Sequence, residues 1–270
     1  MTSDRVTFEK DIVYGAGGGR ELKLDIYVPP NQAANATAPS VLLVHGGGWS
    51  SGDREQLRGY GIRLGRRGYV CVACEYRLSG EATWPAPLYD VKAALRWMRA
   101  NSARVGIDPG KITVHGISAG AHLALMVAAT PNMPRFEGTG GSPGFGTEVA
   151  AAIGVYTPTD LGRARSEGAV AQLMGPDADD AAYQAASPIT YVRRDFPPTL
   201  LIHGNQDRIV PLSDSLRLHQ ALLDHGAPAE LHTFNGQPHA FDFDPEYGRL
   251  CAEIMLVFMN RHVLQPQQER

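Results

Sequence analysis

The chain has 270 residues, of which 43% are hydrophobic, so it can bury a substantial core, and we expect one α/β domain over residues 1–270. Its formal net charge of −3 provides no basic field, which argues against nucleic acid or an anionic membrane as a partner. The first ten residues lack a secretory signal, no later run could span a bilayer, and the odd number of cysteines suits a reducing compartment. These features predict a cytoplasmic protein.

The first predicted elements are strands. Residues 6–14 and 21–29 are predicted to form an antiparallel pair around the glycine-rich GAGGG. Residues 40–48 (SVLLVHGGG) predict a strand that runs into a loop, and residues 69–78 (YVCVACEYRL) predict the next strand. A helix follows WPAP, because four apolar residues recur there at helical spacing: Leu88, Val91, Leu95 and Met98.

Strands and helices alternate in the rest of the chain. Further strands are predicted at 111–116, 149–156, 198–204 and 229–234, and helices at 119–129, 213–226 and 249–263. This alternation is typical of a mostly parallel sheet, here of eight strands, with helices on both faces. Two segments, near 131–148 and 160–198, are predicted as loop insertions that shape an entrance.

The motif G-x-S-x-G occurs at residues 116–120 (GISAG), between an apolar strand and an alanine-rich helix. This context predicts a nucleophile elbow, in which a sharp turn exposes the serine hydroxyl at the N-terminus of a helix. Side chains at Gly116 or Gly120 would crowd the neighbouring strand and helix. Ser118 is therefore the candidate nucleophile.

A serine hydroxyl needs a base, and the base needs a carboxylate to orient it. Among the nine histidines, His239 in FNGQPHAF occupies a loop directly after the last predicted strand, whereas the others fit strand ends, helices or the tail. Asp207 lies in the loop after a buried strand, while Asp242 and Asp244 are too near His239 in sequence to approach its ring from behind. The order Ser118, Asp207, His239 is the order expected of an α/β-hydrolase.

Attack on an acyl carbon produces an oxyanion, which requires hydrogen-bond donors. The run VHGGGWSSGD follows a strand and offers glycine N–H groups, so we expect Gly46 and Gly47, with Ala119 from the elbow, to form an oxyanion hole. A phosphate-binding loop is excluded because no Gly-Lys-Ser/Thr follows, and the absence of zinc-ligand spacing predicts no metal site.

Together these motifs resemble the α/β-hydrolase superfamily, specifically the HGGG carboxylesterases related to hormone-sensitive lipase and the smaller bacterial acetyl or feruloyl esterase-like enzymes. The resemblance runs from about Val41 to Phe241, through HGGGW, EYRL, WPAPLYD, GISAGAHLA, HGNQDRIVP and PHAF. The hormone-sensitive lipase group usually carries an amino-terminal helical cap and an acidic residue before the serine. This chain has about forty residues before HGGGW, and Ile117 before the serine. It therefore resembles the smaller branch, with little or no cap.

The resemblance implies a serine carboxylesterase that hydrolyses short-chain acyl or small aryl esters through an acyl-enzyme, with a small-molecule ester as its partner and no cofactor. Related esterases are often dimers, so a homodimer is possible. An arylformamidase or other amidase is the alternative, since formamidases share the HGG loop and the three catalytic residues. A ligand-binding protein on a retired hydrolase fold is less favoured, because Ser118, Asp207 and His239 are all present.

Four aromatic residues are candidates for the substrate pocket. Ordinary packing explains each of them equally well at this stage. They are Trp49, Trp84, Tyr156 and Phe241.

Overall fold

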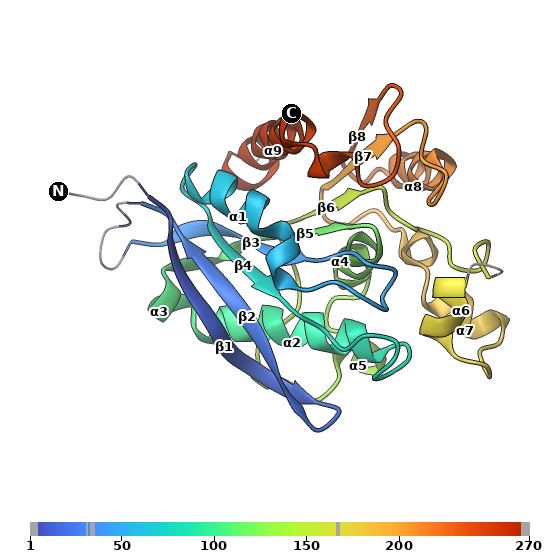
Figure 1. Cartoon of the computed structure of the whole chain (residues 1–270), viewed down its shortest axis with the longest axis horizontal. Coiled ribbons are helices and arrows are strands. Elements are labelled where there is room, and N and C mark those ends of the chain that lie inside the picture. The colour runs from blue at the N-terminus through green and yellow to red at the C-terminus, as the bar shows by residue number, and fades with distance from the viewer. Residues whose placement is uncertain (1–4, 31, 33–35, 166–167, 266–270) are drawn as a thin grey trace.

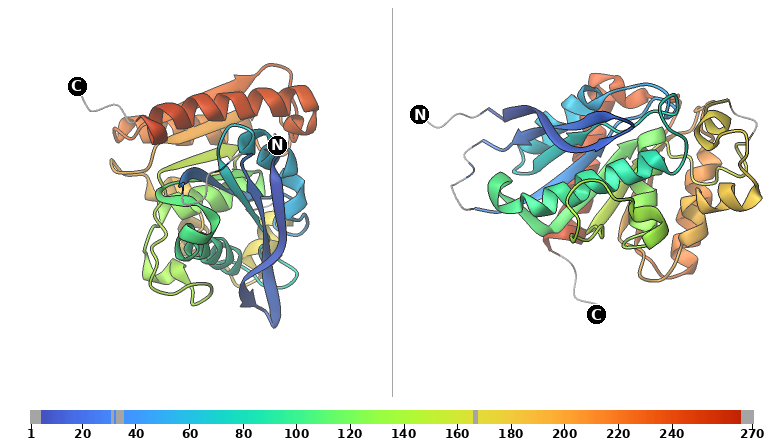
Figure 2. Two further views of the ribbon diagram at one scale, coloured as in Figure 1. Left: turned by 90° about the vertical axis from the view of Figure 1, so that its left-hand side faces the viewer. Right: turned by 90° about the horizontal axis from the view of Figure 1, so that it is seen from below.

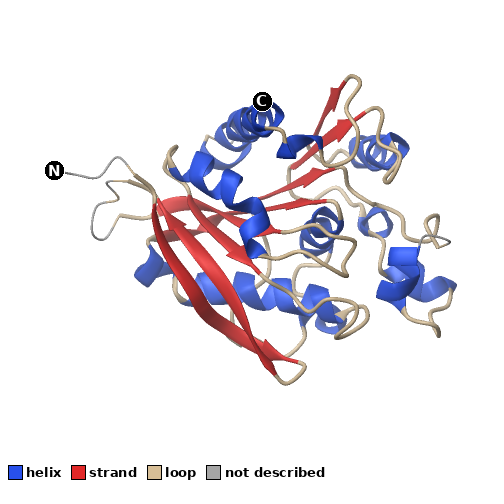
Figure 3. Ribbon diagram, in the orientation of Figure 1, coloured by secondary structure: helices blue, strands red, loops and turns tan. Residues whose placement is uncertain are grey.

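A computed structural model describes residues 5–30, 32, 36–165 and 168–265. The described residues form one eight-stranded sheet, coloured red in Figure 3. Its strands are β1 (Thr7–Gly17), β2 (Arg20–Val28), β3 (Ala38–Val44), β4 (Val70–Cys74), β5 (Ile107–Ile117), β6 (Ala151–Val155), β7 (Thr199–Gly204) and β8 (Ala229–Phe234). They lie in the order β1-β2-β4-β3-β5-β6-β7-β8. β1 and β2 pair antiparallel, β2 pairs antiparallel with β4, and the remaining pairs are parallel.

Helices cover both faces of the sheet (Figures 1 and 2). The α-helices are α1 (Arg58–Gly65), α2 (Ala86–Ala100), α3 (Ser102–Val105), α4 (Ala119–Ala129), α5 (Pro134–Glu137), α6 (Gly168–Met174), α7 (Asp180–Ala185), α8 (Leu212–Asp224) and α9 (Pro245–Met259). α1 and α9 lie on one face, and α2 and α4 lie on the other. Within the described ranges, no helix has both the length and the apolar character needed to cross a bilayer.

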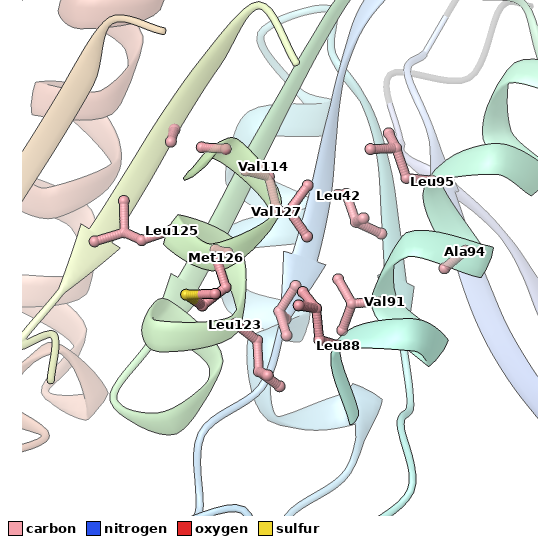
Figure 4. Close-up of a cluster of buried hydrophobic side chains, with 14 of the residues drawn as sticks. Leu42, Leu88, Val91, Ala94, Leu95, Val114, Leu123, Leu125, Met126 and Val127 are labelled. Atoms are coloured by element: carbon pink, nitrogen blue, oxygen red, sulfur yellow. The ribbon is translucent and has the colours of Figure 1, made fainter. Parts of the chain in front are cut away.

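The two faces of the sheet have separate hydrophobic cores, because side chains alternate along each strand. In β3, Leu42 and Val44 belong to the core beneath α2 and α4, whereas Val41 and Leu43 belong to the core beneath α1 and α9. Figure 4 shows the first core, where residues of α2 and α4 meet Leu42 of β3 and Val114 of β5. The central strands are therefore buried on both sides, which explains why they appear in the sequence as continuous apolar runs.

The predicted strands are confirmed, but helix α1 was missed. The segment RGYGIRLG forms α1, although its three glycines lower helix propensity. The structure explains the glycine at position 61: a Cβ there would lie 2.8 Å from the ring of Tyr27 on β2, so there is no space for a side chain. The helix at 213–226 is also shifted: α8 begins at Leu212, and its N-cap is Pro211.

The segment 160–198, predicted as a loop, contains helices, and its residues 166–167 lie outside the described part. It holds α6, α7 and the 3₁₀ turn η2 (Pro188–Tyr191). Val170 and Leu173 are almost completely buried in the core, and the carboxylate of Asp179 caps α7 by accepting the N–H of Ala182. The prediction that this segment is loop-like therefore missed its short helices, because burial of a few apolar residues stabilises helices that lack a strong sequence pattern. The other insertion, 131–148, contains the four-residue α5 and is otherwise irregular, as expected.

The turn from β5 into α4 leaves no space for a side chain at two positions. A Cβ on Gly116 would lie 2.2 Å from the carbonyl oxygen of Gly120. A Cβ on Gly120 would lie 2.2 Å from the carbonyl oxygens of Val44 and His45 at the end of β3. Glycine at both positions therefore allows the helix to start directly against the sheet, as the sequence predicted.

We predict that Gly120→Ala lowers the free energy of unfolding by about 1–3 kcal/mol, because the added methyl group meets fixed backbone atoms rather than a flexible side chain. Gly80→Ala is the matched control, since a Cβ at Gly80 has no neighbour within 4 Å. Urea unfolding followed by circular dichroism measures both variants. Equal stabilities would contradict the tight packing of the turn.

Candidate functional site

Ser118 occupies the turn between β5 and α4 in a strained backbone conformation. Its φ of 51° and ψ of −122° lie in a region that non-glycine residues rarely adopt. The N–H of Ser118 donates to the carbonyl of Val155 at 2.9 Å, which fixes the turn to the end of β6. The serine is thus held at the N-terminus of α4, where the helix dipole is positive.

A continuous chain of hydrogen bonds links Ser118 to two distant loops. The Oγ of Ser118 lies 3.0 Å from Nε2 of His239, and Nδ1 of His239 lies 2.7 Å from Oδ2 of Asp207. The imidazole is 14% exposed, whereas the carboxylate side chain is fully buried. The structure thus brings together the three residues that the sequence selected from loops after β5, β7 and β8.

The carboxylate of Asp207 is held by several donors. Its Oδ1 accepts the N–H groups of Ile209 and Val210 at 2.8 and 2.9 Å, and Nε2 of His203 lies 3.4 Å from its Oδ2. Burial opposes ionisation, but the hydrogen bonds from His203, His239 and Val210 outweigh burial and lower the pKa of Asp207. The carboxylate therefore stays ionised at neutral pH and requires the Nδ1–H tautomer of His239.

The glycine loop after β3 passes directly beside the serine. A Cβ on Gly46 would lie 3.3 Å from the Cβ of Ser118. The N–H of Gly46, however, donates to Oε1 of Gln56 at 2.7 Å, so the predicted role of Gly46 as a free donor disagrees with this structure. Among the described residues, no acceptor is found for the N–H groups of Gly47, Gly48 and Ala119.

Gln56 was missed by sequence reasoning. It lies in the 3₁₀ turn η1 (Arg54–Leu57), ten residues after Gly46, and no motif marks it. Its side-chain oxygen satisfies a buried backbone donor and thereby fixes the start of the glycine loop. Asp53, which caps η1 by accepting the N–H of Glu55, is the only local signal in the sequence that a short helix begins there.

Several other histidines have structural partners. His45 stacks on Tyr76, with ring centroids 4.2 Å apart, and its Nδ1 contacts the carbonyl of Gly46 at 2.8 Å. His122 accepts Nε1–H of Trp49 at 3.3 Å and contacts the carbonyl of Ala186 at 2.7 Å. Burial lowers the pKa of His122 to about 4, so its ring is neutral. These contacts agree with the packing roles expected for histidines outside the site.

The four aromatic residues proposed for the pocket are mostly covered. Trp49, Tyr156 and Phe241 are 3%, 1% and 4% exposed, respectively, because other side chains pack over them. Trp84 is partly exposed and lies against His122 and Phe136. Three of the four are therefore core residues in this structure, and Trp84 alone among them is partly exposed.

A cavity of about 420 Å³ opens beside the imidazole. It is lined by Gln206, Arg208, Ile209, Pro238 and His239. Ile209, which is 62% exposed, separates it from a second cavity of about 230 Å³ between the start of segment 160–198 and α8. No sequence motif marks this cavity, because loop residues line it.

Comparison with known proteins agrees with this arrangement. The family model described as BD-FAE matches residues 24–222. The chain is 37% identical over 269 residues to esterase LipQ of Mycobacterium tuberculosis, covering 92% of this chain and 61% of LipQ. It thus spans about three-fifths of the length of this curated relative.

Two solved structures of one esterase are similar throughout. Propionate-bound Est2 of Thermogutta terrifontis superposes with a TM-score of 0.83 at 28% identity, covering 97% of this chain and 96% of that chain. The form of that esterase phosphonylated by cyclosarin gives a TM-score of 0.81 at 29% identity, covering 93% and 92%.

The predicted fold is therefore confirmed by the sheet order, by the family match over most of the chain, and by the similarity to esterase structures. The chain belongs to the BD-FAE family and has the α/β-hydrolase fold.

Proposed function

We propose that the protein is a serine carboxylesterase acting on small-molecule esters. The observation that carries this proposal is the unbroken chain from Ser118 Oγ through His239 to the buried carboxylate of Asp207. The similarity to LipQ and to esterase structures supports the same activity. No cofactor is required for this chemistry.

The proposed reaction has two steps. Nε2 of His239 takes the proton from Ser118 as Oγ attacks the ester carbonyl, and the resulting imidazolium then gives this proton to the departing alcohol. Water attacks the acyl-enzyme in the second step, with His239 again taking and returning a proton. Asp207 holds the imidazole in the required tautomer and stabilises its charged form throughout.

The oxyanion hole is proposed to consist of the amides of Gly47 and Ala119, with Gly48 in place of Gly46. These three N–H groups have no acceptor among the described residues, and they lie in the loop beside Ser118 and at the first residue of α4. Each donor of this kind contributes about a hundred- to a thousandfold in turnover. Because Gln56 already holds the Gly46 amide, that amide supports the loop instead of the substrate.

The proposed substrates are short-chain acyl or small aryl esters. The cavity beside His239 is about 420 Å³ and has Arg208, Gln206 and the apolar Ile209 in its walls, which suits the alcohol part of a small ester. Est2, the similar esterase, has been solved with propionate and with butyrate. We also propose a cytoplasmic location, supported by three free, buried cysteines: Cys71, Cys74 and Cys251. The homodimer stays a prediction.

We predict that Ser118→Ala reduces turnover of 4-nitrophenyl acetate or butyrate by about 10⁴-fold or more, because no nucleophile remains. Ser40→Ala is the control, since its buried hydroxyl has no partner among the described residues and its loss should be neutral. Initial rates of nitrophenolate release measure both variants. Turnover by Ser118→Ala at the wild-type rate would rule out the proposed nucleophile.

We predict that a fluorophosphonate probe labels Ser118 and that His239→Ala slows this labelling at least about a thousandfold, because the hydroxyl then lacks its base. Mass spectrometry identifies the labelled residue and gives the rate. His225→Ala is the control, since His225 is an exposed residue at the end of α8. The base assignment fails if both variants are labelled at similar rates.

Parallel assays of phenyl acetate and N-formylaniline test the amidase alternative. We predict faster hydrolysis of the ester, because an alkoxide or phenoxide leaves more readily than an amine, which must be fully protonated as it departs. The measurement is kcat/KM for each substrate with the same enzyme preparation. Preferential hydrolysis of the anilide would favour an arylformamidase.

A further inference from the structure

The His239 loop contains a second buried carboxylate that the proposed reaction does not use. Asp242 is 6% exposed and lies three residues after His239, in the 3₁₀ turn η3 (Phe241–Phe243). Its Oδ2 accepts the hydroxyl of Tyr60 at 2.9 Å, and its Oδ1 accepts the hydroxyl of Tyr156. A carboxylate buried in this way is costly unless hydrogen bonds compensate it, so its retention beside the site calls for a physical role.

Tyr156 connects this carboxylate to the imidazole. Its ring centroid lies 4.4 Å from that of His239, and the two planes are inclined by 55°. The backbone of Tyr156 has a φ of 41°, and its N–H donates to the carbonyl of Ile202 at 2.8 Å. A bulky residue in this conformation is strained, and such strain is concentrated at functional sites. The tyrosine is thus fixed at its backbone by β7 and at its hydroxyl by Asp242, with the histidine ring against its face.

The groups around Asp242 come from four elements besides its own loop. Tyr60 lies on α1, Tyr156 follows β6, and the thiol of Cys251 lies on α9. Burial and the charge of Asp242 raise the pKa of both tyrosines well above the usual value, so both hydroxyls stay protonated and donate. Burial also raises the pKa of Cys251 to about 12, so the thiol stays neutral.

The fourth element is β5, whose His115 packs against Tyr60, the residue that donates to Asp242. His115 on β5 packs against the ring of Tyr60 with centroids 4.8 Å apart, and burial lowers the pKa of His115 to about 4. His239 is then the group in these surroundings that gains positive charge during the proposed reaction. Burial raises the pKa of Asp242 above its usual value, whereas the hydrogen bonds from Tyr156 and Tyr60 and the attraction to a positive charge on His239 favour the ionised carboxylate.

We propose that Tyr156 and Asp242 are positioning residues for His239: the carboxylate locks the tyrosine hydroxyl, and the tyrosine ring holds the imidazole where Nε2 reaches Ser118. This inference rests on the proposed function and deepens it. Two effects are separable. The ring restricts the orientation of the imidazole, while the negative charge of Asp242 adds to that of Asp207 in stabilising the imidazolium.

The two effects give different kinetic signatures. In Tyr156→Phe the ring is retained but is no longer anchored, so kcat falls about tenfold with little change in KM, because a misplaced base impairs proton transfer more than substrate binding. In Asp242→Asn the negative charge that faces the imidazole is lost, so the positively charged form of His239 is less stabilised. The acid limb of the kcat/KM profile therefore moves to lower pH in Asp242→Asn and keeps its position in Tyr156→Phe.

The experiment compares both variants with Tyr247→Phe. Tyr247 belongs to the same aromatic cluster, and its hydroxyl accepts Nε2–H of Gln237 at 2.7 Å. Its ring packs on Phe234 and Phe241, and it makes no hydrogen bond to Asp242 among the described residues. We expect this control to retain kcat within about twofold and to leave the pH profile unchanged. The measurements are kcat and KM for 4-nitrophenyl acetate between pH 5 and 9, the rate of fluorophosphonate labelling, and circular dichroism to verify folding.

The proposal is overturned if Tyr156→Phe and Asp242→Asn have the same kcat and the same pH profile as Tyr247→Phe. If Asp242→Asn does not fold, the kcat of Tyr156→Phe alone tests the proposal. Tyr156→Phe should fold, because it keeps the volume of the ring and the buried carboxylate retains Tyr60 as a donor. Failure of the underlying function is recognised separately, by full activity of Ser118→Ala. An inactive Ser118→Ala together with unaffected Tyr156→Phe and Asp242→Asn would leave the esterase proposal intact and remove only the positioning roles.

Discussion

The tight packing of the β5–α4 turn against β3 is the constraint on which the rest of the site depends. The backbone carbonyls of Val44 and His45 occupy the space that a side chain at Gly120 would need. The helix therefore begins in direct contact with the neighbouring strand, and Ser118 takes a conformation that a free chain would avoid. The extensive burial of β3, β5 and α4 offsets this local strain. The hydroxyl of Ser118 and the glycine loop consequently lie side by side.

Parallel strand order then brings the other groups to the same place. Strands β3, β5, β6 and β7 lie side by side and run in one direction, so the loops that follow them open at one edge of the sheet. The glycine loop, Ser118, Tyr156 and Asp207 each follow one of these strands, and His239 follows β8. Ser118 and His239 are 121 residues apart and Asp207 and His239 are 32 residues apart, yet their side chains meet within hydrogen-bond distance.

The sequence predicted the strands, the elbow and the hydrogen-bonded set of Ser118, Asp207 and His239, because each depends on local patterns: apolar runs, glycine spacing and residues placed just after a strand. The donor in the glycine loop could not be resolved in this way, since the partner of Gly46 is the side chain of Gln56, which no motif marks. The exposure of the four aromatic residues could not be predicted either, because the sequence pattern does not distinguish a buried tryptophan or tyrosine from an exposed one. The short helices of segment 160–198 depend on tertiary burial rather than on propensity.

The 3₁₀ turn η1 and helix α1 contact both the glycine loop and the loop of His239, but they contain none of the three proposed catalytic residues. Gln56 holds the backbone of the glycine loop, and one turn of helix later Tyr60 holds Asp242 in the loop of His239. A single stretch of five residues therefore supports both the glycine loop, where negative charge is proposed to develop, and the loop of His239, the proposed base. A change of tilt in this stretch would therefore displace the glycine loop and the His239 loop together.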